Sequence, residues 1–517
     1  MKYKIILIHI TLYAIIFSET NSNLSSYEYF LHGEYEFLNK NYSKAEINYL
    51  KALLEFPQSV TILQSLVEIK IIQGKYNDAI SLLNEILIID PSNRKSSLDL
   101  FELLIEKEDH IKLESHLDSL LFYYSNDEEI LFYISNYQLI YQKWYDLLLT
   151  YHKIYLLNNK YNYLLSDIYE IGISTDNIQL TYEIFTKLKD NNENKKILEY
   201  LALIAEYNNN NNESIFLLKE IINKYGRTEE VTIKLAKLNL KIKNFNEVTQ
   251  ILAPLYIKGN RSLEVLNMLL VSYSILKDNK NEIQISNSII DEYPNLPIGY
   301  EALAYSYLSK KKYHSAIEIL IKAINKFPNE ISLSFNLAKI LSEIEEYSKA
   351  EKYYRYTLSI NPNYRSAKHA MAMMYEEMNN FLRSDSLFQD IIKQNKDDAI
   401  GQNDYAYIIA EREIVNEEDL FYALNLAKNA LNIEPENVAF LDTVGWIYYK
   451  LGNYNKAFEY IHKSLTIDEE NLVILEHLGD VYIKLNKSSE ALKIYKRILK
   501  RDKKNKLIME KINTINE

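Results

Sequence analysis

The sequence contains no cysteine, and among its 517 residues only 10 are glycine and 8 are proline. The absence of cysteine excludes disulfides, thiolate zinc sites, cysteine nucleophiles and the lipid-modified cysteine of a bacterial lipoprotein. The scarcity of glycine and proline argues against a sheet-rich fold, which needs many tight turns. The net charge of −12 disfavours nucleic-acid binding, because phosphate contacts rely on clustered Lys and Arg.

The N-terminus has the pattern of an export signal. Lys2 and Lys4 precede an uncharged run from Ile5 to Ser18, and a polar stretch follows. This order predicts a secretory signal peptide over residues 1–22, with an indistinct cleavage site. The run is shorter than the roughly 20 residues that span a bilayer, and no other apolar run is longer. We therefore expect an exported protein, periplasmic or associated with the cell surface, without a transmembrane span in the mature chain. The alternative is an uncleaved N-terminal membrane anchor or a hydrophobic first helix.

The dominant signal in the sequence is a repeat of 34 residues. Pro57 and Pro91 are separated by this distance, and so are Pro328 and Pro362. Because proline interrupts helices, prolines in one phase mark the loops of a helical repeat. Five of the eight prolines share this phase if the twelfth repeat carries about five extra residues near 413–420. The repeats then begin at residues 26, 60, 94, 128, 162, 196, 230, 264, 297, 331, 365, 399, 438 and 472.

Small and aromatic residues follow the same frame. Two antiparallel helices cross most closely where their side chains are small. The eighth position holds such residues at Gly33, Ala304, Ala338, Ala372, Ala406, Gly445 and Gly479. The twentieth position holds them at Ala45, Ala79, Ala316, Ala350, Ser384, Ala423, Ala457 and Ala491. Aromatic side chains occupy the seventeenth position, just after the predicted turn, at Tyr76, Trp144, Tyr313, Tyr347, Phe381 and Tyr454.

The segment LDTVGWIYYKLGNYNKAFEYIHKSLTID, from Leu441 to Asp468, resembles a tetratricopeptide repeat almost position by position. The resemblance implies an all-α fold, a right-handed superhelical solenoid of about 14 helix pairs whose first helices line a concave groove. Stacking of the pairs is also what the physics requires, because one pair cannot bury its apolar face alone. We expect N-terminal repeats over residues 23–93, divergent helical repeats over 94–296, C-terminal repeats over 297–505 and a tail over 506–517.

The divergent middle keeps the 34-residue pitch but not the small residues. In the frame above, its twentieth position holds Leu113, Leu147, Thr181, Ile215, Thr249 and Ile283. Its register is therefore left open.

No catalytic motif is recognisable. The sequence lacks the phosphate-binding, dinucleotide-binding, zinc-protease and nucleophile-elbow patterns, so we expect no enzyme, no cofactor and no metal. His110 and His116 are six residues apart, a spacing that does not place them on one helix face. The acidic cluster between Glu411 and Asp419 could hold a divalent cation, but without fixed ligand spacing a solvated acidic loop is the favoured interpretation.

The resemblance places positions five and nine of the C-terminal repeats in the groove. There they form an aromatic and acidic lining, and we predict a protein or peptide partner bearing basic residues. The alternative is that these side chains only pack against neighbouring helices. The clamp of Lys, Arg and Asn that binds chaperone tails in some family members is missing. The predicted partner-binding residues are Tyr305, Phe335, His369, Tyr407, Asp442, Trp446, Glu476 and Asp480.

Two classes of function fit these observations. The first is a non-catalytic scaffold for protein–protein interaction, which we expect in a bacterial cell envelope in a role related to assembly or secretion. The second is a sensor or enzyme whose active part lies in the divergent middle. An intracellular or membrane-anchored assembly factor is a further alternative. The sequence does not indicate the partner's identity or the oligomeric state.

Overall fold

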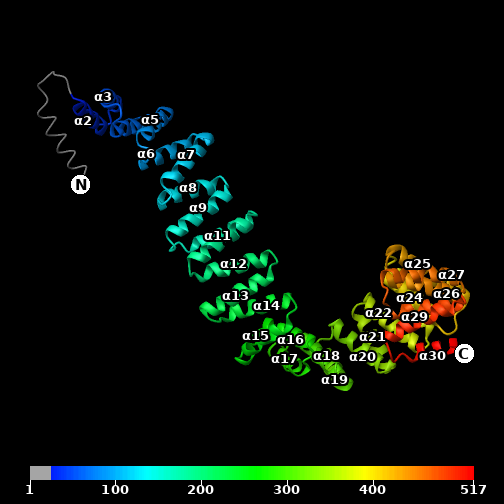
Figure 1. Ribbon diagram of the computed structural model, residues 1–517. Helices are drawn as coiled ribbons and strands as arrows, with labels where there is room; N and C mark the ends of the chain where they lie inside the picture. The colour runs from blue at the N-terminus through cyan, green and yellow to red at the C-terminus, as the bar shows by residue number, and fades with distance from the viewer. Residues whose placement is uncertain (1–24, 517) are drawn as a thin grey trace. The chain divides into compact units, whose positions relative to one another are not determined.

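The computed structural model describes residues 25–516, and every regular element in this range is a helix (Figure 1). The helices form 14 consecutive pairs, and α30 (Lys506–Asn516) follows alone. The first seven pairs are α2 (Ser26–Leu38) with α3 (Tyr42–Glu55), α4 (Val60–Ile72) with α5 (Tyr76–Ile89), α6 (Arg94–Glu106) with α7 (His110–Tyr123), α8 (Glu128–Ile140) with α9 (Trp144–Leu157), α10 (Tyr163–Ser174) with α11 (Ile178–Asn191), α12 (Lys195–Tyr207) with α13 (Asn211–Tyr225), and α14 (Glu229–Lys241) with α15 (Phe245–Ile257).

The remaining seven pairs continue the same alternation. They are α16 (Leu263–Ile275) with α17 (Asn279–Glu292), α18 (Ile298–Leu308) with α19 (Tyr313–Lys326), α20 (Ile331–Glu343) with α21 (Tyr347–Ile360), α22 (Arg365–Glu377) with α23 (Phe381–Gln394), α24 (Ala399–Glu411) with α25 (Glu417–Ile433), α26 (Val438–Lys450) with α27 (Tyr454–Ile467), and α28 (Leu472–Lys484) with α29 (Ser488–Arg501). The prediction of an all-α array of about 14 helix pairs is confirmed. The segment expected as a tail contains α30.

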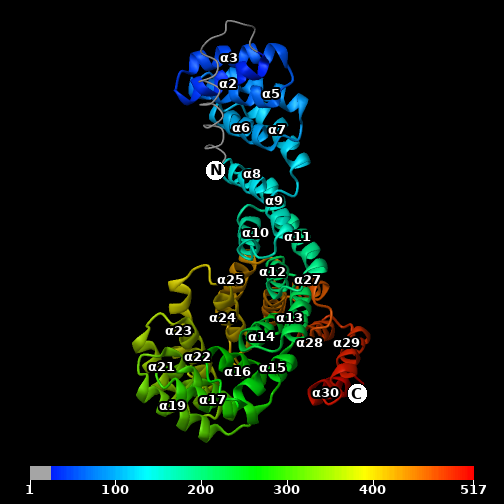
Figure 2. The same cartoon turned by 90° about the vertical axis from the view of Figure 1, so that its left-hand side faces the viewer.

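The chain divides into two compact units, residues 1–238 and 239–517, with the boundary inside α14. Within each unit, successive pairs pack against one another in chain order, as the turned view in Figure 2 also shows for α2 to α7. The predicted signal peptide, residues 1–22, lies outside the described residues. In the part of the chain that the structure describes, no helix is long and apolar enough to cross a membrane.

The structure fixes the register of the middle repeats. Helices α12, α14 and α16 begin at residues 195, 229 and 263, one residue before the predicted starts. The side chains buried at the twentieth position are therefore those of Ser214, Val248 and Glu282. The prediction that placed other residues there was wrong by one position; those residues are Ile215, Thr249 and Ile283.

The corrected frame makes the middle more regular than its sequence suggested. Ala202 and Ala236 now occupy the eighth position, and both are fully buried. Pro294 falls in the loop between α17 and α18, in phase with the other loop prolines. The divergent repeats thus keep several small residues at their helix crossings.

Small residues at the crossings are paired with large ones on the facing helix. A Cβ atom added at Gly33 would lie 2.5 Å from ring atoms of Tyr49, and one at Gly445 would lie 2.5 Å from the side chain of Ile461. Such distances are far below van der Waals contact, so only glycine fits. At these two crossings, the bulky residue at the twenty-fourth position explains the glycine at the eighth.

In thirteen of the fourteen described pairs, the turn inside the pair has one residue with positive φ. Gly74 and Gly452 occupy it with φ of 70° and 75°. The same turn position in eleven other pairs is filled by Lys40, Glu108, Gln142, Asp176, Asn209, Lys243, Lys277, Lys311, Glu345, Asn379 and Asn486. The left-handed conformation is therefore set by the repeat, and glycine only makes it easier.

The twelfth pair departs from the period, as predicted. Its α25 has 17 residues where most second helices have 14, and the segment from Arg412 to Asn416 precedes it. Asn416 caps α25 by accepting a hydrogen bond from the Asp419 backbone amide at 2.8 Å. The extra residues lengthen the turn and add part of a helical turn, so the flanking pairs keep their stacking.

The assigned repeat register can be tested by placing a larger side chain at a helix crossing. Ala457 on α27 is fully buried at a crossing, whereas the adjacent Lys456 is exposed. We expect Ala457→Leu, and likewise Ala316→Leu, to lower the free energy of unfolding by about 1–3 kcal/mol. Lys456→Leu should change the free energy of unfolding very little. Urea titration would measure all three variants. Equal losses at Ala457 and Lys456 would contradict the assigned frame.

Candidate functional site

The predicted partner-binding residues lie on consecutive first helices of the second unit. Tyr305 is on α18, Phe335 on α20, His369 on α22 and Tyr407 on α24. Asp442 and Trp446 are on α26, while Glu476 and Asp480 are on α28. The structure gathers them into two groups, a pocket between α20 and α22 and a buried polar cluster around α26 and α28.

The pocket between α20 and α22 encloses about 540 Å³. Phe335 and Met373 line it from the two helices, and Tyr354 of α21 also contributes. The Phe335 ring is fixed by an edge-on contact with Tyr364, with ring centroids 5.3 Å apart. Met373 is 37% exposed, so a flexible apolar side chain is accessible in the pocket.

The charged groups of the pocket differ along its length. His369 and Arg365, near the start of α22, are both paired with the next repeat. His369 Nε2 lies 3.0 Å from a carboxylate oxygen of Asp404, and Arg365 makes two hydrogen bonds to Asp398. At the opposite end the pocket is lined by Glu343 and Glu377, the last residues of α20 and α22.

Lys339 also lines the pocket, whereas Tyr305 lies outside its lining. Lys339 is exposed, with its ammonium nitrogen 5.8 Å from the centre of the Phe335 ring. Tyr305, on the preceding first helix, is 52% exposed and adjoins Asn336 of α20. The result is an apolar floor with a cation near its middle and carboxylates at one end.

The second group is centred on Trp446, which is only 8% exposed. Its indole ring is stacked between Tyr449 and His477, at centroid distances of 4.7 and 4.0 Å. Its Nε1–H donates to a carboxylate oxygen of Glu411 at 2.6 Å. Trp446 therefore does not offer the exposed flat surface that the sequence suggested.

Asp442 is equally enclosed, at 7% exposure, and both of its carboxylate oxygens lie 3.0 Å from Nδ1 of His477. The neighbouring Tyr407 is partly buried. Its burial, together with the carboxylates of Glu411, Asp442 and Glu476, raises the pKa of Tyr407 to about 12. The phenol is thus neutral and surrounded by negative charge.

Glu476 and Asp480 share one lysine of the C-terminal helix. Lys511 of α30 lies 2.7 Å from Glu476 and 2.7 Å from Asp480. Tyr495 also donates to Asp480, at 2.6 Å. The two acidic residues predicted to attract a basic partner already hold an internal lysine.

These contacts share one spacing that the sequence analysis missed. A residue on one first helix pairs with a residue 35 positions later, on the next first helix. The pairs are His369 with Asp404, Asp442 with His477, and Glu476 with Lys511. In a 34-residue repeat this offset joins neighbouring helices one position apart, so complementary groups at i and i+35 would have indicated the pairs.

Within residues 25–516, no group of three or more His, Asp or Glu side chains is arranged to hold an ion. The acidic residues around the turn of the twelfth pair, Glu413 and Glu417 to Asp419, are exposed to solvent. The solvated-loop interpretation accounts for them.

Comparisons with known proteins agree with this geometry. A family model described as tetratricopeptide repeat matches residues 299–328 and 331–364. A second model, described as anaphase-promoting complex, cyclosome, subunit 3, matches residues 417–498.

The BBSome complex member BBS4 of Bos taurus is 28% identical over 127 residues, which are 25% of this chain and 22% of that protein. The TPR repeat-containing protein PA4667 of Pseudomonas aeruginosa is 25% identical over 182 residues, 34% of this chain and 30% of that protein. The chain thus spans less than a third of either relative.

Similar solved structures have low scores. The crystal structure of the APC/C hetero-tetramer Cut9-Hcn1 is 14% identical over 96% of this chain and 97% of that chain, with a TM-score of 0.38. A tetratricopeptide repeat protein from Parabacteroides merdae is 16% identical over 49% of this chain and 98% of that chain, with a TM-score of 0.41. We take no partner or activity from them.

Paired helices in a frame close to 34 residues, small residues at most crossings and a positive-φ turn in each regular pair define a helical-repeat protein. The chain belongs to the tetratricopeptide-repeat superfamily.

Proposed function

We propose that this protein is a non-catalytic scaffold that binds a segment of a protein partner on the first-helix face of its C-terminal repeats. The observation that carries the proposal is the pocket of about 540 Å³ between α20 and α22. It offers an accessible apolar floor on the face where positions five and nine repeat. Solenoids of this kind expose extended surfaces suited to peptides and helices.

The pocket also suggests the chemistry of the segment. One apolar side chain of the partner would contact Phe335 and Met373, because aromatic and apolar contacts in a pocket carry most interface energy. Glu343 and Glu377 would face a basic residue beside that anchor, and such rim charges chiefly affect association rate and salt dependence. The carboxylates of Asp442, Glu476 and Asp480 take no part in this step, because His477 and Lys511 hold them.

Two methionines on or beside α22 give a matched test. Met373 lines the pocket and is 37% exposed, whereas Met378, at 40%, follows the helix and lines no part of the pocket. The partner would be purified with the native chain and its affinity measured by calorimetry. We expect Met373→Glu to weaken binding at least about tenfold, the equivalent of 1.4 kcal/mol, and Met378→Glu to leave it unchanged. Equal effects of the two variants, both folded by circular dichroism, would reject the pocket as the binding site.

We further propose that the scaffold acts outside the cytoplasm, in the bacterial cell envelope, in an assembly or secretion role. Support comes from the charged start and short apolar run of residues 1–22. N-terminal sequencing of protein from the envelope fraction should begin between residues 19 and 23. Recovery of intact Met1 from that fraction would favour an anchor, and recovery from the cytoplasm would reject export.

A further inference from the structure

The second helices of the first four pairs carry an apolar row that the proposed groove does not use. Their thirteenth residues are Leu54, Ile88, Phe122 and Leu156. These side chains are 81%, 82%, 76% and 53% exposed. Because the same position recurs on successive second helices, they form one line across α3, α5, α7 and α9, which we call the apolar row.

The rest of the array shows that the fold does not require this. At the same position the other regular second helices of the described chain carry polar, exposed residues, with one exception. They are Asp190, Asn223, Asp291, Asn325, Ser359, Lys393, Thr466 and Lys500. The exception, Ile257 on α15, is 78% exposed and stands between polar neighbours at this position. A single exposed apolar residue is ordinary, but four in a row on adjacent repeats mark a contact surface.

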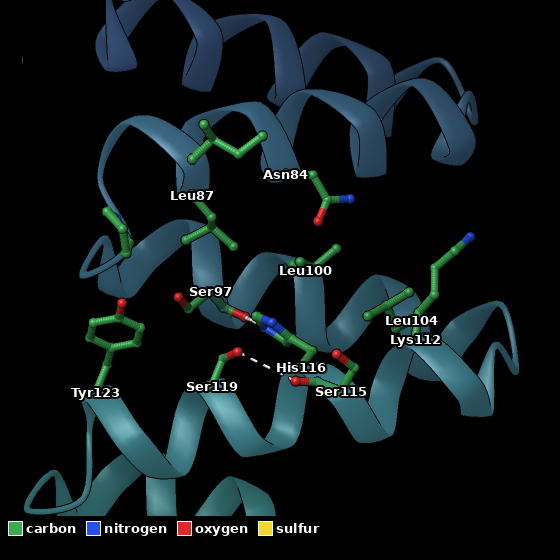
Figure 3. Close-up of a pocket in the computed structure, with 12 residues that line it drawn as sticks. Asn84, Leu87, Ser97, Leu100, Leu104, Lys112, Ser115, His116, Ser119 and Tyr123 are labelled. Carbon is green, nitrogen blue, oxygen red and sulfur yellow. Dashed lines mark hydrogen bonds between the residues drawn. The ribbon is translucent and has the colours of Figure 1, made fainter.

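Two pockets lie between the second helices that carry the row. A pocket of about 490 Å³ between α3 and α5 is lined by Leu50, Leu54 and Pro57. A second pocket, also about 490 Å³, lies between α5 and α7 (Figure 3). Leu87 enters the latter from one side and Tyr123 from the other.

The floor of the second pocket is apolar, formed by Leu100 and Leu104 of α6. His116 also lines it, and its ring nitrogen lies 2.8 Å from the Ser97 carbonyl oxygen. Burial lowers the pKa of His116, so the imidazole adds no charge near neutral pH. Lys112 is the only charged residue of the lining.

The two pockets lie between successive second helices, so they follow the same spacing as the side chains of the row. A surface with this spacing is complementary to another array with the same spacing, so its best-matched occupant is the same surface of a second copy. Exposed apolar neighbours, among them Ile47, Leu50 and Tyr123, widen the row. Together they present apolar area on the order of several hundred Å², comparable to the largest apolar patch of a typical monomer and a substantial part of the ~800 Å² per partner of standard dimers.

We propose that the apolar row is the interface of a two-fold symmetric dimer of this chain. We place the two-fold axis perpendicular to the row, through its centre between the second and third side chains. With the axis in this direction the two rows run antiparallel. Leu54 of one copy lies opposite Leu156 of the other, and Ile88 lies opposite Phe122.

The absence of cysteine makes this arrangement directly testable. Full-length copies carrying Leu54→Cys would be mixed with copies carrying Leu156→Cys and treated with a short bismaleimide. We expect efficient cross-linking of that mixture and of Ile88→Cys with Phe122→Cys, and little cross-linking of Leu54→Cys with itself. Efficient cross-linking of Leu54→Cys with itself would overturn the antiparallel pairing.

Oligomeric state gives the second arm of the test. By sedimentation equilibrium, the pair Ile88→Asp and Phe122→Asp should raise the dimer dissociation constant at least about 100-fold. The single change Ile257→Asp should leave it unchanged. The fold tolerates aspartate at this position, as Asp190 and Asp291 show, and circular dichroism would verify folding.

Three results would overturn the proposal. One is a full chain that stays monomeric at about 100 μM, far above the concentrations at which specific dimers form. Another is a dimer that the Ile88 and Phe122 changes leave intact. The third is a monomer that binds phosphatidylcholine vesicles or a helical peptide through the row, which would assign the row to a membrane or to another protein.

Discussion

Trp446→Ala should lower the free energy of unfolding by about 3–5 kcal/mol, the range for removing a large buried aromatic side chain. The indole lies between Tyr449 and His477 and is almost fully enclosed. Its removal would leave a cavity between α26 and α28 and would deprive Glu411 of its hydrogen-bond donor. Hydrogen exchange would measure the change. The backbone amides of α26 and α28 should lose the most protection, and the amides of the first unit serve as an internal reference.

Trp446→Phe separates packing from hydrogen bonding. It keeps an aromatic ring between Tyr449 and His477 but cannot donate to Glu411, so a smaller loss of about 1–2 kcal/mol is expected. A stable, folded Trp446→Ala variant that loses only its partner would contradict this account. In that case the residue would be the binding anchor that its position in the sequence suggested.

The array itself was largely predictable because its determinants are local and repeated. The loops are marked by Pro57, Pro91, Pro328 and Pro362. A small residue at a crossing lets two helices approach closely wherever it occurs. The predicted starts therefore fall within one residue of the observed first helices. The one-residue error in the middle arose because the spacing varies there: α12 begins 32 residues after α10, and α18 begins 35 residues after α16.

The site was harder to predict because exposure is not a local property. Asp442 and Trp446 occupy groove positions, yet the adjacent helix α28 covers them with His477. Glu476 and Asp480 would face solvent if the array ended at α29, but α30 brings Lys511 onto them. Position within a repeat gives the direction of a side chain, and only the next repeat decides whether it is free to bind.

Arg412→Ala should cost about 3 kcal/mol of stability, at the lower end of the range for breaking a buried ion pair because one partner is partly exposed. The guanidinium lies 2.7 Å from Glu376 and 2.6 Å from Asp385, with side-chain exposures of 11%, 13% and 26% for the three residues. Its centre is also 4.7 Å from that of the Phe381 ring. Burial alone lowers the pKa of Arg412, but the two carboxylates outweigh it and the net pKa is raised. Loss of the arginine would leave both carboxylates enclosed without a cation.

Arg497 is the matched control for this prediction. It lies 2.8 Å from Glu470, but the two side chains are 40% and 45% exposed, so Arg497→Ala should cost no more than about 0.5 kcal/mol. Replacing the whole cluster by Arg412→Met, Glu376→Gln and Asp385→Asn should recover much of the loss, since no unpaired charge remains. Both comparisons can be made by thermal unfolding monitored by circular dichroism. If Arg412→Ala lowered the free energy of unfolding no more than Arg497→Ala, the ion pairs of Arg412 with Glu376 and Asp385 would not be what joins the eleventh pair to the twelfth. The five-residue insertion would then have to be held by the packing of α24 against α25 alone.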